Sequence, residues 1–240
     1  MPETFQDVIT SLLRQHLPEL PGLAELHDAQ GMDRLALELS GFCVALAEAN
    51  KQINLTGIVD PEGMAVRHVL DALTALPALK GDGVLVDLGS GCGVPGIPLA
   101  LALPQRQVVL VESRERKAAA LVALVDDLGL SPRVSAVRAR GEVWLAEHPA
   151  DEVVTRAVGS IADQLKLLRK AREAFSRVVM LKGPGADDEL AQVSDRLTEL
   201  GFEPPERFSA ELPHGAGSRV LLAFEPTQTR ASRGRRSRRA

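Results

Sequence analysis

Three features of the sequence predict an α/β fold, in which helices cover both faces of a mostly parallel sheet. From residue 84 onward, short runs rich in β-branched residues alternate with longer stretches of helical periodicity. A glycine-rich loop follows the first of these runs and leads directly into a helical stretch. Before residue 80 the apolar residues recur at helical spacing. We therefore expect an N-terminal helical unit over residues 1–79 and a sheet-containing domain over residues 80–226.

The N-terminal unit contains three apolar stripes of helical period, which occupy residues 5–17, 35–50 and 64–76. The third stripe follows the helix start signal Asp60-Pro61 and ends near Pro77. Beyond it, six runs predict strands, namely Val84–Leu88, Gln107–Val111, Val134–Val137, Glu152–Thr155, Val178–Leu181 and Arg219–Phe224. Helices are expected between them at Pro95–Leu103, Arg114–Leu128, Ser160–Ala174 and Asp187–Leu200.

The end of the chain predicts how the sheet is completed. The segment Phe202–Leu212 contains Pro204 and Pro205, so we expect an edge strand or a loop there. We expect the last strand, Arg219–Phe224, to be antiparallel. The sheet would then have about seven strands, which is normal for such enzymes.

The composition is that of a globular protein, with 45% hydrophobic and 25% charged residues in 240. No apolar run reaches the roughly 18 to 20 residues of a membrane span. Residues 1–20 lack the basic start and apolar centre of a signal peptide. Two cysteines and five scattered histidines offer no metal-ligand spacing. We therefore expect a cytoplasmic monomer without a membrane segment or a metal.

The net charge of −4 hides an asymmetry between the body and the last residues. Residues 230–240 carry six arginines and no acid, while the remaining 229 residues hold 22 basic and 32 acidic groups, a balance of −10. Such a segment lacks the apolar residues needed to fold. We expect residues 227–240 to be a disordered basic tail, which either seeks a polyanion or is simply solvated.

The glycine-rich loop lies within Val84–Gly96, which reads VLVDLGSGCGVPG. A phosphate-binding P-loop is excluded, because no lysine in the chain is followed by Ser or Thr. A dinucleotide site remains open, because Gly91–Gly96 matches GxGxxG and Glu112 lies about twenty residues further on. However, Asp87 stands two residues before Gly89, and Asp-Leu-Gly-Ser-Gly-Cys-Gly resembles the acid-x-Gly-x-Gly-x-Gly signature of class I methyltransferases, which use S-adenosylmethionine (AdoMet). This register favours AdoMet over a dinucleotide.

Five further motifs accompany this loop. The motifs are Asn50-Lys-Gln-Ile-Asn-Leu-Thr56, Arg67-His-Val-Leu-Asp71, Arg140-Gly-Glu142, Thr155-Arg-Ala157 and Leu181-Lys-Gly183. Together with the loop they resemble the RsmG (GidB) family, which methylates N7 of a guanine in small-subunit (16S) ribosomal RNA. The resemblance covers residues 33–224. The chain departs from the family at Cys92, at Gly141, where Ala or Val is usual, and in the basic tail.

The resemblance implies a class I AdoMet-dependent, Rossmann-like methyltransferase fold and a set of site residues. AdoMet would lie against Asp87, Gly89, Gly91, Gly93, Val94, Glu112, Gly141, Glu142 and Arg156. These residues follow predicted strands at their carboxyl ends, where open α/β sheets bind ligands. Two simpler interpretations stay open: Glu112 as an exposed strand-end acid, and Arg156 as a surface arginine paired with an acid.

The implied reaction needs positioning more than acid-base chemistry. Guanine N7 carries a lone pair and no proton, so the methyl group is displaced directly. The resemblance implies that Arg156, Lys182, Arg67 and His68 hold the RNA or the guanine. His68 and Asp71 could instead be a helix i,i+3 pair that ties the N-terminal unit to the sheet. Lys51 and Asn54 could cap a helix or contact RNA.

The sequence lacks the motifs that methyl transfer to an exocyclic amine or to cytosine C5 would need. No Asn/Asp-Pro-Pro-aromatic motif follows the fourth strand, where the sequence reads Thr-Arg-Ala-Val. Cys43 lies on an apolar helix stripe and Cys92 in the loop, so neither is placed as a nucleophile, and Cys92 is a small buried spacer. We expect an rRNA guanine-N7 methyltransferase that acts on ribosomal RNA or the 30S subunit. The alternatives are an NAD(P)-dependent oxidoreductase and a non-catalytic RNA-binding assembly factor.

Overall fold

The computed structural model describes residues 3–227 and confirms the predicted fold class. Seven strands form one sheet in the order β3-β2-β1-β4-β5-β7-β6. The first five strands are parallel, and β7 and β6 are antiparallel to their neighbours. The strands are β1 (Leu85–Leu88), β2 (Val108–Glu112), β3 (Val134–Arg138), β4 (Glu152–Arg156), β5 (Arg177–Lys182), β6 (Glu206–Glu211) and β7 (Ser218–Phe224). The segment 202–212, for which we expected an edge strand or a loop, therefore contains an edge strand.

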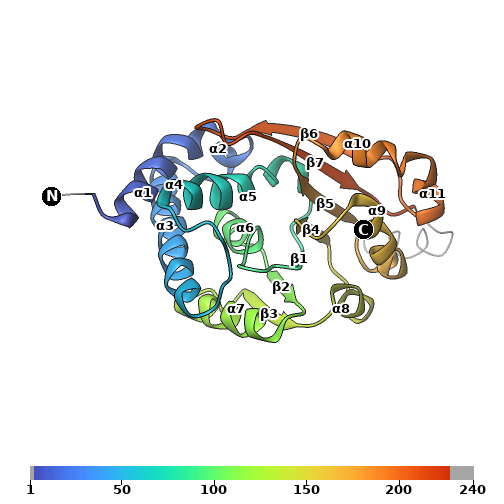
Figure 1. The fold of residues 1–240 in the computed structure, drawn as a ribbon, viewed down its shortest axis with the longest axis horizontal. Helices are drawn as coiled ribbons and strands as arrows, with labels where there is room; N and C mark the ends of the chain where they lie inside the picture. Colours follow the sequence, from blue (N-terminus) through green and yellow to red (C-terminus); the bar gives the residue numbers. More distant parts are fainter. Residues whose placement is uncertain (1–2, 228–240) are drawn as a thin grey trace.

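Helices cover both faces of this sheet (Figure 1). Before the sheet come α1 (Phe5–His16), η1 (Leu17–Glu19), α2 (Leu23–Leu26), α3 (Ala29–Gln52), α4 (Pro61–Gly63), the π-helix η2 (Met64–Leu70), α5 (Asp71–Leu73) and η3 (Leu76–Ala78). Between the strands lie α6 (Gly96–Ala102), α7 (Glu115–Asp127), α8 (Gly141–Glu147), α9 (Ile161–Leu168), η4 (Arg169–Ala174), α10 (Ala186–Ala191), η5 (Ser194–Arg196) and α11 (Leu197–Leu200).

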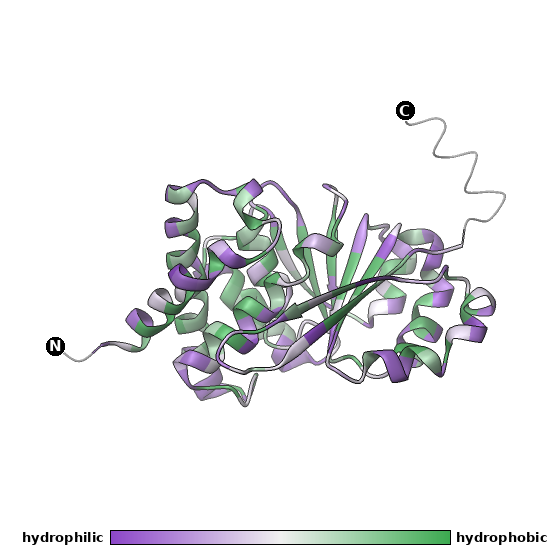
Figure 2. Cartoon of the chain, turned by 90° about the horizontal axis from the view of Figure 1, so that it is seen from above, coloured by the Kyte–Doolittle hydropathy of each residue, from purple (hydrophilic) through white to green (hydrophobic). Residues whose placement is uncertain are grey.

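Two apolar clusters cover the two faces of the sheet. One contains residues of α1, α3, η2, α6 and α7 together with the strand residues Leu85 and Leu110. The other contains residues of α8, α9 and α11 with Val86 and Val153. Figure 2 shows the strands as largely hydrophobic, with hydrophilic residues on the outer turns of the helices. The N-terminal helices thus share one core with the sheet instead of forming a separate one.

Several helices differ from their predicted bounds. The third N-terminal stripe is not one α-helix but α4, a π-helix and α5. The stretch 187–200 is divided into α10, η5 and α11, and α8 has no counterpart in the prediction. Helix α6 begins at Gly96, with Pro95 at its N-cap. The division at residues 79/80 stays a prediction, and the basic tail lies outside the described residues apart from Thr227.

Candidate active site

The glycine-rich loop joins β1 to α6 at the carboxyl edge of the sheet. Gly89, Gly91 and Gly93 have φ values of +74°, +59° and +87°, which L-residues rarely adopt. Gly96 is required for a different reason, since a Cβ there would lie 2.7 Å from the Asp87 carboxylate and 2.3 Å from Leu110 Cδ2. The loop therefore follows a path that only a glycine-rich sequence permits.

Asp87 is fully buried beneath this loop. Its Oδ2 accepts the main-chain N–H of Gly96 at 2.9 Å, whereas its Oδ1 is buried without a hydrogen-bond partner. Burial raises the pKa of Asp87 to about 7, although the Gly96 hydrogen bond and the positive charge of Arg156 act in the opposite direction. A buried carboxylate oxygen without a donor is suited to receive one from a ligand.

Glu112 fastens the loop to the end of β2. Its Oε2 accepts the N–H of Gly91 at 3.1 Å and its Oε1 accepts the N–H of Arg114 at 2.8 Å. Glu112 is only 7% exposed, so it is not an exposed strand-end acid. Since each carboxylate oxygen has a second lone pair, both can still accept a ligand hydroxyl.

Gly141 and Glu142 form the first turn of α8, beside the end of β1. A Cβ at Gly141 would lie 2.9 Å from Cδ2 at the end of the Leu88 side chain, so α8 begins directly against the last residue of β1. Glu142 is half-buried, and Val94 in the loop is buried. The predicted cofactor residues thus follow the carboxyl ends of β1, β2 and β3, and the last of them, Arg156, ends β4.

Arg156, the last residue of β4, is held by three groups of the N-terminal unit. Its Nη1 donates to the Arg67 carbonyl at 2.9 Å and to Asp71 Oδ2 at 3.0 Å, and its Nη2 lies 3.3 Å from His68 Nδ1. Asp71 also accepts from Arg219 Nε of β7 at 2.7 Å. Arg156 therefore pairs with an acid, as the simpler interpretation had it, but in a largely buried cluster in which one carboxylate serves two guanidinium groups.

His68 is buried in the same cluster, and its Nε2 lies 2.8 Å from the Thr56 hydroxyl. Burial, and then the Arg156 charge, lower the pKa of His68 to about 4. The neutral ring accepts from Arg156 and donates to Thr56. His68 and Asp71 thus tie the helices to the sheet through Arg156 and not by pairing with each other.

Arg67 and Lys182 each lie beside an acid, and their predicted contact with RNA stays a prediction. The Arg67 side chain is half-exposed and stands 3.6 Å from Asp60, so only its carbonyl joins the Arg156 cluster. Lys182 Nζ donates to the Gly159 carbonyl at 2.9 Å and pairs with Glu189 at 2.8 Å. The backbone just before Gly159 is strained, since Ala157 has a φ of +56°.

Three further residues, Asn50, Thr56 and Arg219, organise the site although no sequence pattern indicates their roles. Asn50 Oδ1 accepts the N–H groups of Leu55 and Thr56 at 2.7 and 2.9 Å, which fixes the loop that reaches His68. The Asn50–Thr56 motif was the available signal for this loop. Asp60, not Asn54 or Lys51, caps the next helix.

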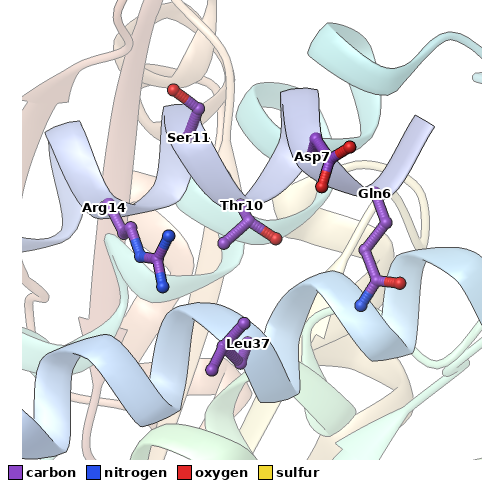
Figure 3. Close-up of a pocket in the computed structure, with 6 residues that line it drawn as sticks. All are labelled: Gln6, Asp7, Thr10, Ser11, Arg14 and Leu37. Atoms are coloured by element: carbon purple, nitrogen blue, oxygen red, sulfur yellow. The ribbon is translucent and has the colours of Figure 1, made fainter. Parts of the chain in front are cut away.

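Two cavities lie outside this cluster of residues. One, of about 470 Å³, is lined by Gln6, Asp7, Thr10, Ser11 and Arg14 of α1 and Leu37 of α3. Figure 3 shows Gln6, Thr10 and Arg14 pointing toward α3, and Ser11 pointing away from it. The other, also about 470 Å³, lies where α3 ends and α7 begins. Among residues 3–227, no group of three or more His, Cys, Asp or Glu side chains is arranged to hold a metal, and no helix is long and apolar enough to cross a membrane.

Substitutions at Cys92 test how tightly the loop is packed. Its side chain is buried, and burial raises the pKa of the thiol against the charges of Arg156 and Lys117. We expect Cys92→Ala to bind S-adenosylhomocysteine within about threefold of the wild type, because only one small group is removed. Cys92→Trp should abolish binding, because the packed loop cannot admit the ring. Calorimetry measures both. Val122→Trp, on the exposed face of α7, is the bulky control, and tolerance of Cys92→Trp would contradict the packing described.

The sheet order, the glycine loop after β1 and the acid at the end of β2 define a class I AdoMet-dependent methyltransferase. The family model for rRNA small subunit methyltransferase G matches residues 36–211. A protein named ribosomal RNA small subunit methyltransferase G from Alteromonas mediterranea is 34% identical over 208 residues, which cover 82% of this chain and 95% of that one. One of the same name from Nitrosomonas europaea is 40% identical over 184 residues, with coverages of 72% and 85%. The chain belongs to the rRNA small subunit methyltransferase G (GidB) family.

A solved structure shows the same fold. TrmK from M. capricolum, in complex with S-adenosylhomocysteine, superposes with a TM-score of 0.50 and 11% identity, over 62% of this chain and 65% of that one. This likeness supports the class I fold independently of the sequence family.

Proposed function

We propose that this chain transfers the methyl group of AdoMet to N7 of a guanine in small-subunit ribosomal RNA. The observation that carries the proposal is the cluster at the carboxyl edge of β1, β2 and β4, in a chain of the methyltransferase G family. We further propose that the protein is a cytoplasmic monomer and takes either ribosomal RNA or the 30S subunit as substrate. AdoMet supplies an electrophilic methyl group when bound.

The residues present fit this cofactor. AdoMet carries a sulfonium and an ammonium group, and the unpartnered Oδ1 of Asp87 is a buried acceptor for a cationic group. Glu112 retains free lone pairs for ribose hydroxyls. Gly89, Gly91, Gly93 and Val94 would present the loop to the ligand, with Gly141 and Glu142 beside the adenine.

The reaction proposed here needs no proton acceptor, and the site is consistent with this. Guanine N7 attacks through its in-plane lone pair, so no bond to hydrogen breaks before the methyl group moves. His68 has both ring nitrogens engaged and a pKa lowered to about 4 by burial, so it is poorly suited to act as a general base at neutral pH. We propose that Arg156 and His68 position the loop and the incoming base, and that Lys182 and Arg67 lie at the rim where RNA approaches.

A pair of glycine variants tests the proposal. Gly89 and Gly129 both have positive φ, but a Cβ at Gly89 would lie 3.0 Å from Val158 Cγ2, whereas nothing lies within 4 Å of one at Gly129. We expect Gly89→Asp to weaken AdoMet binding at least about 30-fold, or about 2 kcal/mol, and to abolish methyl transfer. Gly129→Asp should bind and react normally.

The measurement is transfer of tritiated methyl from AdoMet to 30S subunits from a strain that lacks the modification. RNA binding should survive Gly89→Asp. If the wild type binds RNA and AdoMet but transfers no label, the chain is an assembly factor and the enzymatic proposal is wrong.

A further inference from the structure

A second cavity opens beside the proposed cofactor site. It has a volume of about 470 Å³ and lies between the end of α3, with Gln52 and Asn54, and the start of α7, with Arg114, Arg116 and Lys117. This volume is within the roughly 300 to 1,000 Å³ of ligand pockets. Ile53 and Glu115 complete the lining. Five of its six polar side chains are amides or cations that donate hydrogen bonds, so the chemistry that fits them is an anion with several oxygen acceptors.

Two of the three cations have no partner. Within residues 3–227, the side chains of Arg114 and Arg116 make no hydrogen bond or ion pair, and both are exposed. The neighbouring acid, Glu115, is paired with Arg138 at 3.2 Å. Guanidinium groups left free in a cavity are placed to bind phosphate oxygens, which Arg matches with two parallel N–H groups.

The cavity is connected to the proposed cofactor site on two sides. The main-chain N–H of Arg114 donates to Glu112, the acid at the end of β2. Lys117 Nζ lies 3.3 Å from the Leu55 carbonyl, in the loop that Asn50 and Thr56 hold against His68. An anion bound here would therefore lie against the same loop and strand end that form the site.

The acidic charge of most of the chain favours this basic cavity as the place where a polyanion binds. Residues 1–229 carry a net charge of −10, so most of the surface repels a polyanion. We propose that the cavity lined by Gln52, Asn54, Arg114, Arg116 and Lys117 is a phosphate-binding subsite for the RNA backbone, beside the methyl-transfer site. The inference rests on the proposed function for the identity of the RNA. Phosphate contacts of this kind fix the register of the nucleic acid, while side-chain amides add hydrogen bonds to phosphate or sugar.

The test compares two double variants that remove the same charge. Arg114→Gln with Arg116→Gln removes the subsite. Arg34→Gln with Arg169→Gln removes two exposed arginines, also without partners in the described structure, from the start of α3 and from η4. Binding to protein-free 16S RNA and to 30S subunits is measured at several salt concentrations, together with calorimetric binding of S-adenosylhomocysteine.

The subsite variant should bind RNA about tenfold or more weakly at low salt. Its salt-dependence slope should be smaller by about 0.7 to 0.9 for each phosphate that is no longer neutralised. Its S-adenosylhomocysteine affinity should match the wild type, and the control double variant should change RNA affinity by less than about twofold. The same comparison in chains ending at Pro226 should show the same difference, since the subsite does not depend on the tail.

Three results would overturn the proposal. Equal effects of the two double variants would mean that only net charge matters. Unchanged RNA binding by the subsite variant would exclude phosphate contacts. Weaker binding to 30S subunits but not to free RNA would assign the surface to a ribosomal protein. Because these readouts are affinities, they remain informative even if the wild type transfers no methyl group, which would refute the proposed function alone.

Discussion

Asp87→Asn should weaken cofactor binding but stabilise the cofactor-free protein. We expect the variant to bind S-adenosylhomocysteine at least about 30-fold more weakly, about 2 kcal/mol, because the ligand's ammonium loses a buried, ionised acceptor. In contrast, the cofactor-free variant should melt at a higher temperature than the wild type at pH 8, because a buried charge whose Oδ1 lacks a partner has been removed. The Asn oxygen can still accept the Gly96 N–H.

The pH dependence follows from the raised pKa of Asp87. Burial brings it to about 7, above the ordinary 3.8, so the folded state holds a proton that the unfolded state has released between these values. The contribution of Asp87 to wild-type stability therefore falls as pH rises from about 4 to 7, and the advantage of Asp87→Asn over the wild type should be smaller at pH 5 than at pH 8. Over pH 6 to 8 the wild-type affinity for the cationic cofactor should rise as the carboxyl ionises, and that of the variant should not.

Thermal melting and calorimetry across this range check both trends. Asp127→Asn, at the exposed end of α7, is the control and should change neither quantity. A wild-type cofactor affinity that is flat from pH 6 to 8 would mean that Asp87 does not meet a cationic part of the ligand.

Asp71→Ala should be the most damaging substitution for the fold among the site residues. Asp71 is 4% exposed and accepts from both Arg156 and Arg219, so its removal leaves two largely buried guanidinium groups without their acid. Removal of one member of a buried ion cluster typically destabilises by about 3 kcal/mol or more. For a chain of this size, the melting temperature should fall by about 6 to 12 °C.

Urea unfolding of Asp71→Ala measures this destabilisation. Glu48→Ala is the matched control, because Glu48 pairs with Lys51 on the exposed face of α3 and such pairs contribute about 1 kcal/mol or less. If the free energy of unfolding of Asp71→Ala is within about 1 kcal/mol of the control, the cluster does not join the N-terminal helices to the sheet.

Local sequence patterns were sufficient to predict the strands of the sheet and most of the helices. The β-branched runs placed every parallel strand to within a residue at each end, because buried strands of a parallel sheet are apolar along their whole length. The register of Asp87 against Gly89 favoured AdoMet over a dinucleotide, and the carboxyl sits under the loop that this spacing suggested. The segments that differed, such as the π-helix over Met64–Leu70, have the same 3.6-residue pattern as an α-helix.

The contacts that organise the site could not be predicted from spacing. Asp71 meets Arg156 and Arg219 across 85 and 148 residues of sequence, and no local pattern indicates which charges will pair. For the same reason the pairing of Lys182 with Glu189 could not be predicted. Conversely, Arg114 and Arg116 look like ordinary helix-start residues until the end of α3 is seen to form a cavity with them.

The central claim is tested most directly by mapping the transferred methyl group. Small subunits that lack the modification are incubated with the wild-type chain and AdoMet, and the 16S RNA is digested and analysed by mass spectrometry. We expect one methyl group per RNA, carried as 7-methylguanosine. A methyl group on any other atom or base, or none from a chain that binds S-adenosylhomocysteine, would contradict it.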